Sequence, residues 1–151
     1  MTLRLTPCIV MDGNAKEAVR FYEKVLEAKV LNLQTYGDMP IPCPEALKER
    51  VANAILRIGE SELMLFDAPN LPVPDGNNES DQEQVLTTHH NGNSVVTINI
   101  SINDVGKTKQ IFGILQQGGK VIAPLEEVPF SPAFGTVKDK FGVTFILVTQ
   151  V

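Results

Sequence analysis

Alternating apolar and polar residues mark a strand at residues 96–104, which read VTINISIND. Isoleucines occupy every second position, so one face of this strand is apolar and needs a helix or a core to cover it. The other face carries Thr97, Asn99 and Ser101. Polar side chains in a row on one strand face raise the question of whether that face is simply solvated or forms a binding surface.

Helical periodicity follows this strand and also an earlier strand pattern near the start of the chain. In the earlier copy Asn14 is the predicted N-cap, and Glu17 three residues later completes a capping-box pattern. The apolar residues at helical spacing there are Ala15, Ala18, Val19, Tyr22, Val25 and Leu26. In the later copy Asp104 is the predicted cap, and Gly118 and Gly119 end the helix. The apolar residues of that helix are Val105, Ile111, Phe112 and Leu115.

Two predicted hairpins complete the pattern, one around Gly59–Glu60 and the other around residues 140–142. The two halves of the chain align with each other in a consistent register. The aligned pairs include Thr6 with Thr97, Gly59 with Gly142 and Leu63 with Ile146. One module therefore occurs twice, and each copy is predicted as β-α-β-β-β. The fold class is α+β, with the helix of each module on one face of a small mixed sheet.

Two polar or proline-rich segments interrupt the modules. We predict a first module over residues 1–68, a polar linker over residues 69–93 and a second module over residues 94–151. The linker has few apolar residues, which is typical of a mobile connection or lid. Residues 34–50 contain three prolines and are predicted as an irregular insertion that only the first module carries.

The sheet face opposite each helix has no helix in the sequence to cover it. We expect the two modules to pair so that these faces curve into a cup between them, with the helices outside. A few polar groups among aliphatic side chains are typical of a small-molecule pocket. The residues expected to line the cup are Thr6, Cys8, Leu63, Leu65, Thr97, Asn99, Ser101, Ile146 and Val148. The alternative is an exposed sheet face or a subunit contact whose polar side chains are merely solvated.

Three stretches in this order resemble the vicinal-oxygen-chelate superfamily, which includes glyoxalase I, extradiol dioxygenases and bleomycin-resistance proteins. They are DGNAKEAVRFYEKVLEAKV after the first strand, LRIGESELMLFDA in the middle and VKDKFGVTFILV near the end. The closest similarity is to the PhnB-like branch, and it covers nearly the whole chain apart from the central linker. The resemblance implies a glyoxalase-like fold of two βαβββ modules forming one domain, and it leaves the chemistry open.

Metal-dependent members of this superfamily hold a divalent ion with His or Glu side chains from the first and last strands of each module. By resemblance, the matching positions here are Thr6, Leu63, Thr97 and Ile146. Hydroxyl and aliphatic groups do not provide the imidazole, carboxylate or thiolate donors that such an ion requires. We therefore expect no metal and no cofactor, and neither lyase nor dioxygenase activity that depends on a metal.

Other chemistry-bearing residues are few. His89 and His90 lie in the polar linker, where a solvated loop is the expected environment. Cys8 could serve as a nucleophile, but no basic partner lies nearby in the sequence, and an inert buried thiol is the preferred interpretation. By comparison with PhnB-like proteins, the stretch VPFSPAFGTVKD lacks an expected arginine, which removes a clamp for anions. Phe134 and its neighbour Phe130 are expected either at the mouth of the cup or as anchors of their loop.

Composition excludes several classes of function. The chain has 151 residues, of which 43% are hydrophobic and 21% charged, as in an ordinary globular domain. A net charge of -5 gives no basic surface for nucleic acid or an anionic membrane. The sequence shows no apolar run of membrane-spanning length and no secretory signal pattern, and its two cysteines fit a reducing compartment. We expect a cytoplasmic protein.

The sequence favours metal-free binding of an unknown small molecule in the cup. Two alternatives remain open at this point, namely an enzyme of unknown reaction in the same superfamily and a dimeric interaction protein whose cup is closed. We further expect a homodimer, with the insertion of the first module or the edge strands near the interface, because sheet edges tend to find partners.

Overall fold

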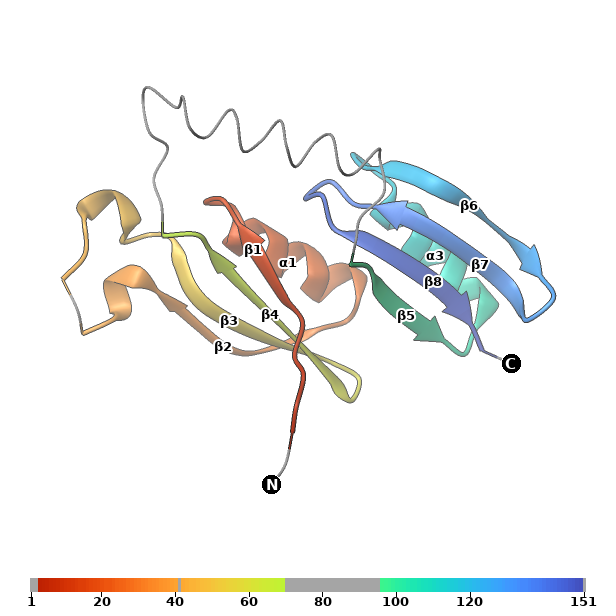
Figure 1. Cartoon of the computed structure of the whole chain (residues 1–151), viewed down its shortest axis with the longest axis horizontal. Coiled ribbons are helices and arrows are strands. Elements are labelled where there is room, and N and C mark those ends of the chain that lie inside the picture. Colours follow the sequence, from red (N-terminus) through yellow and green to blue (C-terminus); the bar gives the residue numbers. More distant parts are fainter. Residues whose placement is uncertain (1–2, 41, 70–95, 151) are drawn as a thin grey trace. The chain divides into compact units, whose positions relative to one another are not determined.

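Two compact units make up the chain, Met1–Leu71 and Pro72–Val151. The computed structural model describes residues 3–40, 42–69 and 96–150. Within these residues, each unit contains one α-helix and a four-stranded mixed sheet (Figure 1). The predicted α+β fold of two βαβββ modules is therefore confirmed for the described residues, and each unit is treated by itself below.

The first unit runs in the order β1 (Cys8–Met11), α1 (Ala15–Val25), β2 (Lys29–Thr35), β3 (Val51–Ile58) and β4 (Ser61–Asp67). Its sheet has the strand order β1-β4-β3-β2, with β1 parallel to β4 and the other pairs antiparallel. The segment between β2 and β3 holds two short 3-10 helices, Tyr36–Asp38 and Glu45–Leu47. The predicted irregular insertion thus starts later than expected, because β2 extends through Thr35.

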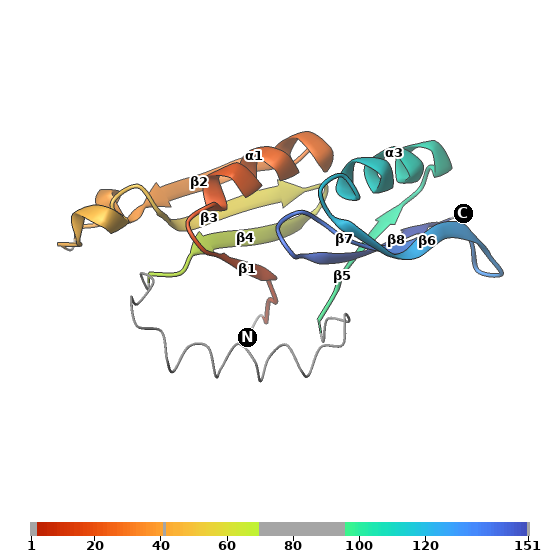
Figure 2. The ribbon, with the colours of Figure 1, turned by 90° about the horizontal axis from the view of Figure 1, so that it is seen from above.

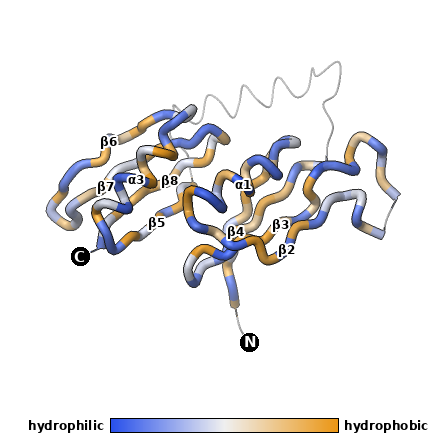
Figure 3. Tube along the Cα trace, turned by 180° about the vertical axis from the view of Figure 1, so that it is seen from behind, coloured by the Kyte–Doolittle hydropathy of each residue, from blue (hydrophilic) through white to orange (hydrophobic). Residues whose placement is uncertain are grey.

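Helix α1 lies along one face of this sheet (Figure 2). All six residues of its predicted apolar stripe are buried, from Ala15 at 0% to Leu26 at 8% exposed. Hydrophobic positions concentrate in β3 and β4, which lie beneath the helix (orange in Figure 3). The helical periodicity therefore identified the buried side of α1 correctly, and burial of this stripe stabilises the first unit.

The N-terminus of α1 is capped from a distant strand rather than by its own N-cap residue. Asn14 occupies the N-cap position but makes no side-chain capping bond, so the predicted capping box with Glu17 is wrong. Instead, Asp67 Oδ1 accepts hydrogen bonds from the backbone N–H groups of Gly13 at 2.7 Å and Ala15 at 3.0 Å. A buried carboxylate at this end of the helix satisfies free N–H groups and complements the helix dipole.

The second unit repeats this order with β5 (Ile98–Ile102), α3 (Val105–Leu115), β6 (Lys120–Val128), β7 (Ser131–Lys138) and β8 (Thr144–Thr149). Its strand order is β5-β8-β7-β6, and β5 is parallel to β8. Helix α3 packs against β7 and β8, with the side chains of Ile111, Phe112 and Leu115 buried as predicted.

Close packing under α3 requires a glycine on β7. A Cβ atom at Gly135 would lie 2.9 Å from the Phe112 ring, well inside van der Waals contact.

The predicted cap of α3 is confirmed, because the Asp104 side chain accepts a hydrogen bond from the Gly106 N–H at 2.9 Å. Gly118, with φ of +75°, then allows the chain to turn after the helix.

The internal repeat is present, but its predicted register is wrong by one residue in the last strands. Cys8 pairs with Met64 in the first unit, and Asn99 pairs with Ile146 in the second. Since Thr6 aligns with Thr97, Cys8 corresponds to Asn99, so Met64 and not Leu63 is the counterpart of Ile146. The turn glycines of the two hairpins misled the alignment, because the hairpins differ in length.

Candidate functional site

The side of the second sheet that faces away from α3 carries the polar row that the sequence singled out. Asn99 and Ser101 are exposed on β5, whereas the isoleucines between them are partly buried on the helix side. Strand pairing extends this surface across the neighbouring strands. We call it the open face of unit 2, and its residues are Asn99, Ser101, Phe134, Thr136, Ile146 and Val148. Thr97, just before β5, is also exposed at the same alternation.

The polar groups of this face lie on β5 and, with Thr136, on β7, and the aliphatic side chains of β8 lie between them. Asn99 Nδ2 donates a hydrogen bond of 3.3 Å to Ser101 Oγ along the β5 edge. Ile146 and Val148 on β8 are half-buried beside them, and Phe134 lies beyond on β7. An amide and a hydroxyl at the margin of an aliphatic and aromatic surface could orient a ligand whose apolar part lies on β8 and β7.

The first sheet also has an open face, directed away from α1. Cys8 and Val10 on β1 share it with Met64 and Phe66 on β4, as the pairing of these strands shows. Both β1 side chains are exposed, and those on β4 are half-buried. Thr6 lies two residues before Cys8, so its side chain is expected on the same face, and it is half-buried. This surface, the open face of unit 1, is therefore more apolar than its counterpart in the second unit.

Two residues expected to line the binding surface lie on the opposite side of the first sheet. Leu63 is 4% exposed and Leu65 is 0% exposed, and both belong to the core beneath α1. Their expected position is wrong because the register of the repeat was shifted by one residue, which moves every side chain of a strand to its other face. Met64 and Phe66 lie on the open face, at the places where Leu63 and Leu65 were expected.

Cys8 is exposed, so the expectation of a buried thiol is wrong. Partial burial of the sulfur nevertheless raises the pKa of the Cys8 thiol. A raised pKa keeps the thiol protonated near neutral pH, which is the opposite of what a nucleophile requires. The structure therefore gives this thiol no activation that would support the enzyme alternative.

The residues at the positions that the sequence resemblance matches to metal ligands do not fit a divalent ion. Thr6 and Thr97 offer only hydroxyl groups, and Ile146 offers no donor. Glu62 is the carboxylate on the open face of unit 1, and it forms a 2.8 Å ion pair with Arg4. In the described ranges, no group of three or more His, Cys, Asp or Glu side chains could hold a metal. His89 and His90 lie outside the described residues.

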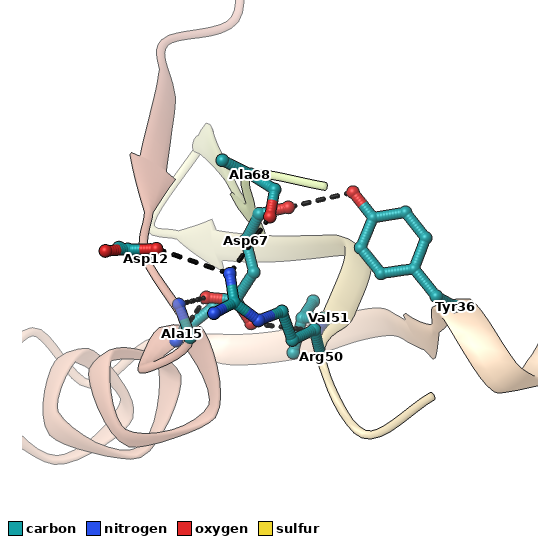
Figure 4. A network of polar contacts seen from close by, with 8 residues as sticks. Asp12, Ala15, Tyr36, Arg50, Val51, Asp67 and Ala68 are labelled. Atoms are coloured by element: carbon teal, nitrogen blue, oxygen red, sulfur yellow. Dashed lines mark hydrogen bonds and ion pairs between the residues drawn. The ribbon is translucent and has the colours of Figure 1, made fainter. Parts of the chain in front are cut away.

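A polar network at the end of β4 connects several elements of the first unit (Figure 4). Besides capping α1, Asp67 accepts a 2.8 Å hydrogen bond from the Val51 N–H, and its own carbonyl oxygen accepts one from Tyr36 Oη at 2.8 Å. Arg50 donates to the Ala68 carbonyl at 3.1 Å and pairs with Asp12 at 3.3 Å. These contacts fasten the segment between β2 and β3 to the first sheet. No local sequence pattern predicts these contacts, since the partners lie far apart in the chain.

Comparison with known proteins identifies relatives of the whole chain. The sequence profile of the Glyoxalase/Bleomycin resistance protein/Dioxygenase superfamily matches residues 4–147. Protein YjdN of Escherichia coli (strain K12) is 27% identical over 153 aligned positions, covering 95% of this chain and 92% of that protein.

Solved structures share the fold. Protein PA1353 from Pseudomonas aeruginosa superposes with a TM-score of 0.77 at 24% identity, covering 99% of this chain and 98% of that one. The PhnB protein from Bacillus cereus superposes with a TM-score of 0.71 at 22% identity, covering 97% of this chain and 99% of that one.

In the part of the chain that the structure describes, no helix is long and apolar enough to cross a membrane.

Proposed function

The chain belongs to the Glyoxalase/Bleomycin resistance protein/Dioxygenase superfamily, and within it we propose a protein that binds a small organic molecule on its open sheet faces without a resident metal ion. The superfamily includes both metal-dependent enzymes and binding proteins, so membership alone does not decide between them. The donor set of this chain favours binding, because its hydroxyl, amide and aliphatic side chains suit an organic ligand better than a cation.

One observation carries this proposal. The open face of unit 2 places Asn99 and Ser101 beside Ile146 and Val148, on a sheet whose other face packs against α3 at β7 and β8. If the polar side chains of β5 were only solvated, the strand beside them would not need to present aliphatic side chains on the same face. A surface on which hydrogen-bonding groups flank apolar groups supports recognition of a molecule with both characters.

Native mass spectrometry of protein purified gently from a cell extract tests the proposal without a guess at the ligand. We expect an additional species whose mass exceeds that of the chain by a few hundred daltons, and we expect acid denaturation to release the extra mass as an organic molecule. Protein that carries only the chain mass, both as purified and after incubation with a metabolite extract, would contradict the proposal.

A further inference from the structure

An open hollow lies at the turn of the β6–β7 hairpin. Its volume is about 720 Å³, within the range of roughly 300–1,000 Å³ found for small-molecule sites. The lining residues are Glu127, Val128, Pro129, Phe130, Ser131 and Pro132. Nothing in the proposed function uses this hollow directly. It adjoins the open face of unit 2, however, because β7 runs from its lining into Phe134.

Phe130 presents an aromatic ring to solvent at this hollow. The residue is 68% exposed, yet its ring is held in place by an edge-to-face contact with Phe134, with the ring centroids 5.1 Å apart and the ring planes at 79°. Such a pair is a favourable arrangement in itself. It also fixes an exposed aromatic surface in one orientation, and a flat ligand can stack on it with little loss of side-chain freedom.

Glu127 is the one charged side chain among the described residues that line the hollow. No lysine or arginine occurs anywhere from residue 121 to residue 137, whereas Glu126 and Glu127 are adjacent. Both glutamates are exposed, and among the described residues neither forms an ion pair. Glu126 is also the pairing partner of Phe134 across the hairpin. A carboxylate without an ion-pair partner among the described residues, in the lining that also contains Phe130, attracts a cation and disfavours an anion.

We infer that the hollow at the β6–β7 hairpin takes a planar aromatic cation, such as a protonated nitrogen heterocycle, which stacks on Phe130 with its positive charge near Glu127. The aromatic ring and the carboxylate each favour such a ligand, and they do so for different physical reasons. The inference rests on the proposed function, because it names the ligand class for one end of the same binding surface.

Two tricyclic probes of similar size and opposite charge test this inference, namely proflavine, which is cationic, and anthracene-9-carboxylate. Fluorescence titration of the whole protein should give proflavine an affinity at least tenfold higher. Replacing Phe130 with alanine should weaken proflavine binding about two- to fivefold, the fold-change expected for loss of a cation–aromatic contact at an exposed ring. Phe130→Tyr keeps the ring and should bind as the wild type does. Glu127→Gln should weaken binding severalfold, whereas Glu60→Gln, on the turn of the other unit, should not change it.

Three outcomes would overturn the inference. These are equal affinity for the two probes, proflavine binding that survives both Phe130→Ala and Glu127→Gln, and binding of neither probe. Circular dichroism of each variant confirms that the fold is retained, as expected for exposed positions. Failure here is distinguishable from failure of the proposed function, because the native mass measurement uses no probe and reports a bound molecule of any chemical class.

Discussion

Thr108 Oγ1 and Thr149 Oγ1 lie 2.7 Å apart in the core of the second unit, where they join α3 to β8 through a buried hydrogen bond. Thr149 occupies the position that Asp67 holds in the first unit, since Met11 pairs with Asp67 and Ile102 pairs with Thr149. Each unit thus uses a buried polar side chain at the end of its last strand to fasten the start of its helix. The chemistry of this contact differs between the copies, although its place in the module is the same.

This pair predicts a non-additive effect on stability. Thr149→Val should lower the free energy of unfolding by about 1–3 kcal/mol, because it leaves the buried Thr108 hydroxyl with fewer partners. Thr108→Val together with Thr149→Val should cost less than the sum of the single changes, since no hydroxyl is then left without its partner. Urea denaturation of the four proteins measures the coupling. Strict additivity would show that the hydrogen bond contributes nothing specific.

The tyrosine that fastens the β2–β3 segment predicts a loss of stability at alkaline pH. Burial raises the pKa of Tyr36, the nearby Asp67 carboxylate raises it further, and Arg50 partly opposes the shift. The folded state therefore favours the neutral phenol. The stability that Tyr36 contributes is present below its ordinary pKa near 10 and is lost as the pH rises through the raised value.

Comparison with Tyr36→Phe isolates this contribution. At pH 8 the variant should be less stable by about 0.5–1.5 kcal/mol, because the hydrogen bond from Tyr36 Oη to the Asp67 carbonyl is gone. At strongly alkaline pH the difference should narrow, since the wild type loses the same bond when the phenol ionises. Chemical denaturation at both pH values gives the measurement. A difference that stayed constant or widened with pH would contradict this assignment.

The outer edge of the first sheet predicts self-association. Among the strands that the structure describes, β2 pairs on one side only, and its Leu31 and Leu33 are 41% and 37% exposed. We expect a homodimer with this edge near the interface, because unpaired edges and exposed apolar side chains favour association. Sedimentation equilibrium at micromolar concentration should give the dimer mass. Leu33→Lys should shift it towards the monomer, whereas Val96→Lys should not, and a wild-type monomer would refute the expectation.

The predicted parts of the fold are those determined by local pattern. The stripe from Ala15 to Leu26 specifies which side of α1 is buried, and Asp104 specifies where α3 begins. Each of these signals lies within a few residues of the feature that it predicts. The cap of α1 could not be found in this way. Asp67 lies 52 residues from Ala15 in the chain, so only the folded sheet brings the two together.

The residues of the candidate surface are correctly predicted where strand alternation alone decides the face, and wrongly predicted where the alignment of the two halves decides it. Alternation placed Asn99 and Ser101 on the exposed side of β5, as observed. Leu63 aligns with Ile146 only through the turn glycines. The true counterpart, Met64, lies one residue further from Gly59 than Ile146 lies from Gly142, and this single residue reverses the face. The expected cup between the modules depends on how the two units pair, and it stays a prediction.

Binding on the open face of unit 2 is tested most directly by native mass spectrometry of two matched amide-to-leucine variants. Asn99→Leu removes the amide from the open face, and Gln110→Leu removes one from the exposed side of α3. We expect both variants to melt near the wild-type temperature, because both positions are exposed. The co-purifying molecule should be lost or greatly reduced in Asn99→Leu and retained in Gln110→Leu. Equal retention of that molecule in the two variants, or a melting temperature that collapses only in Asn99→Leu, would contradict the assignment of this face as the binding surface.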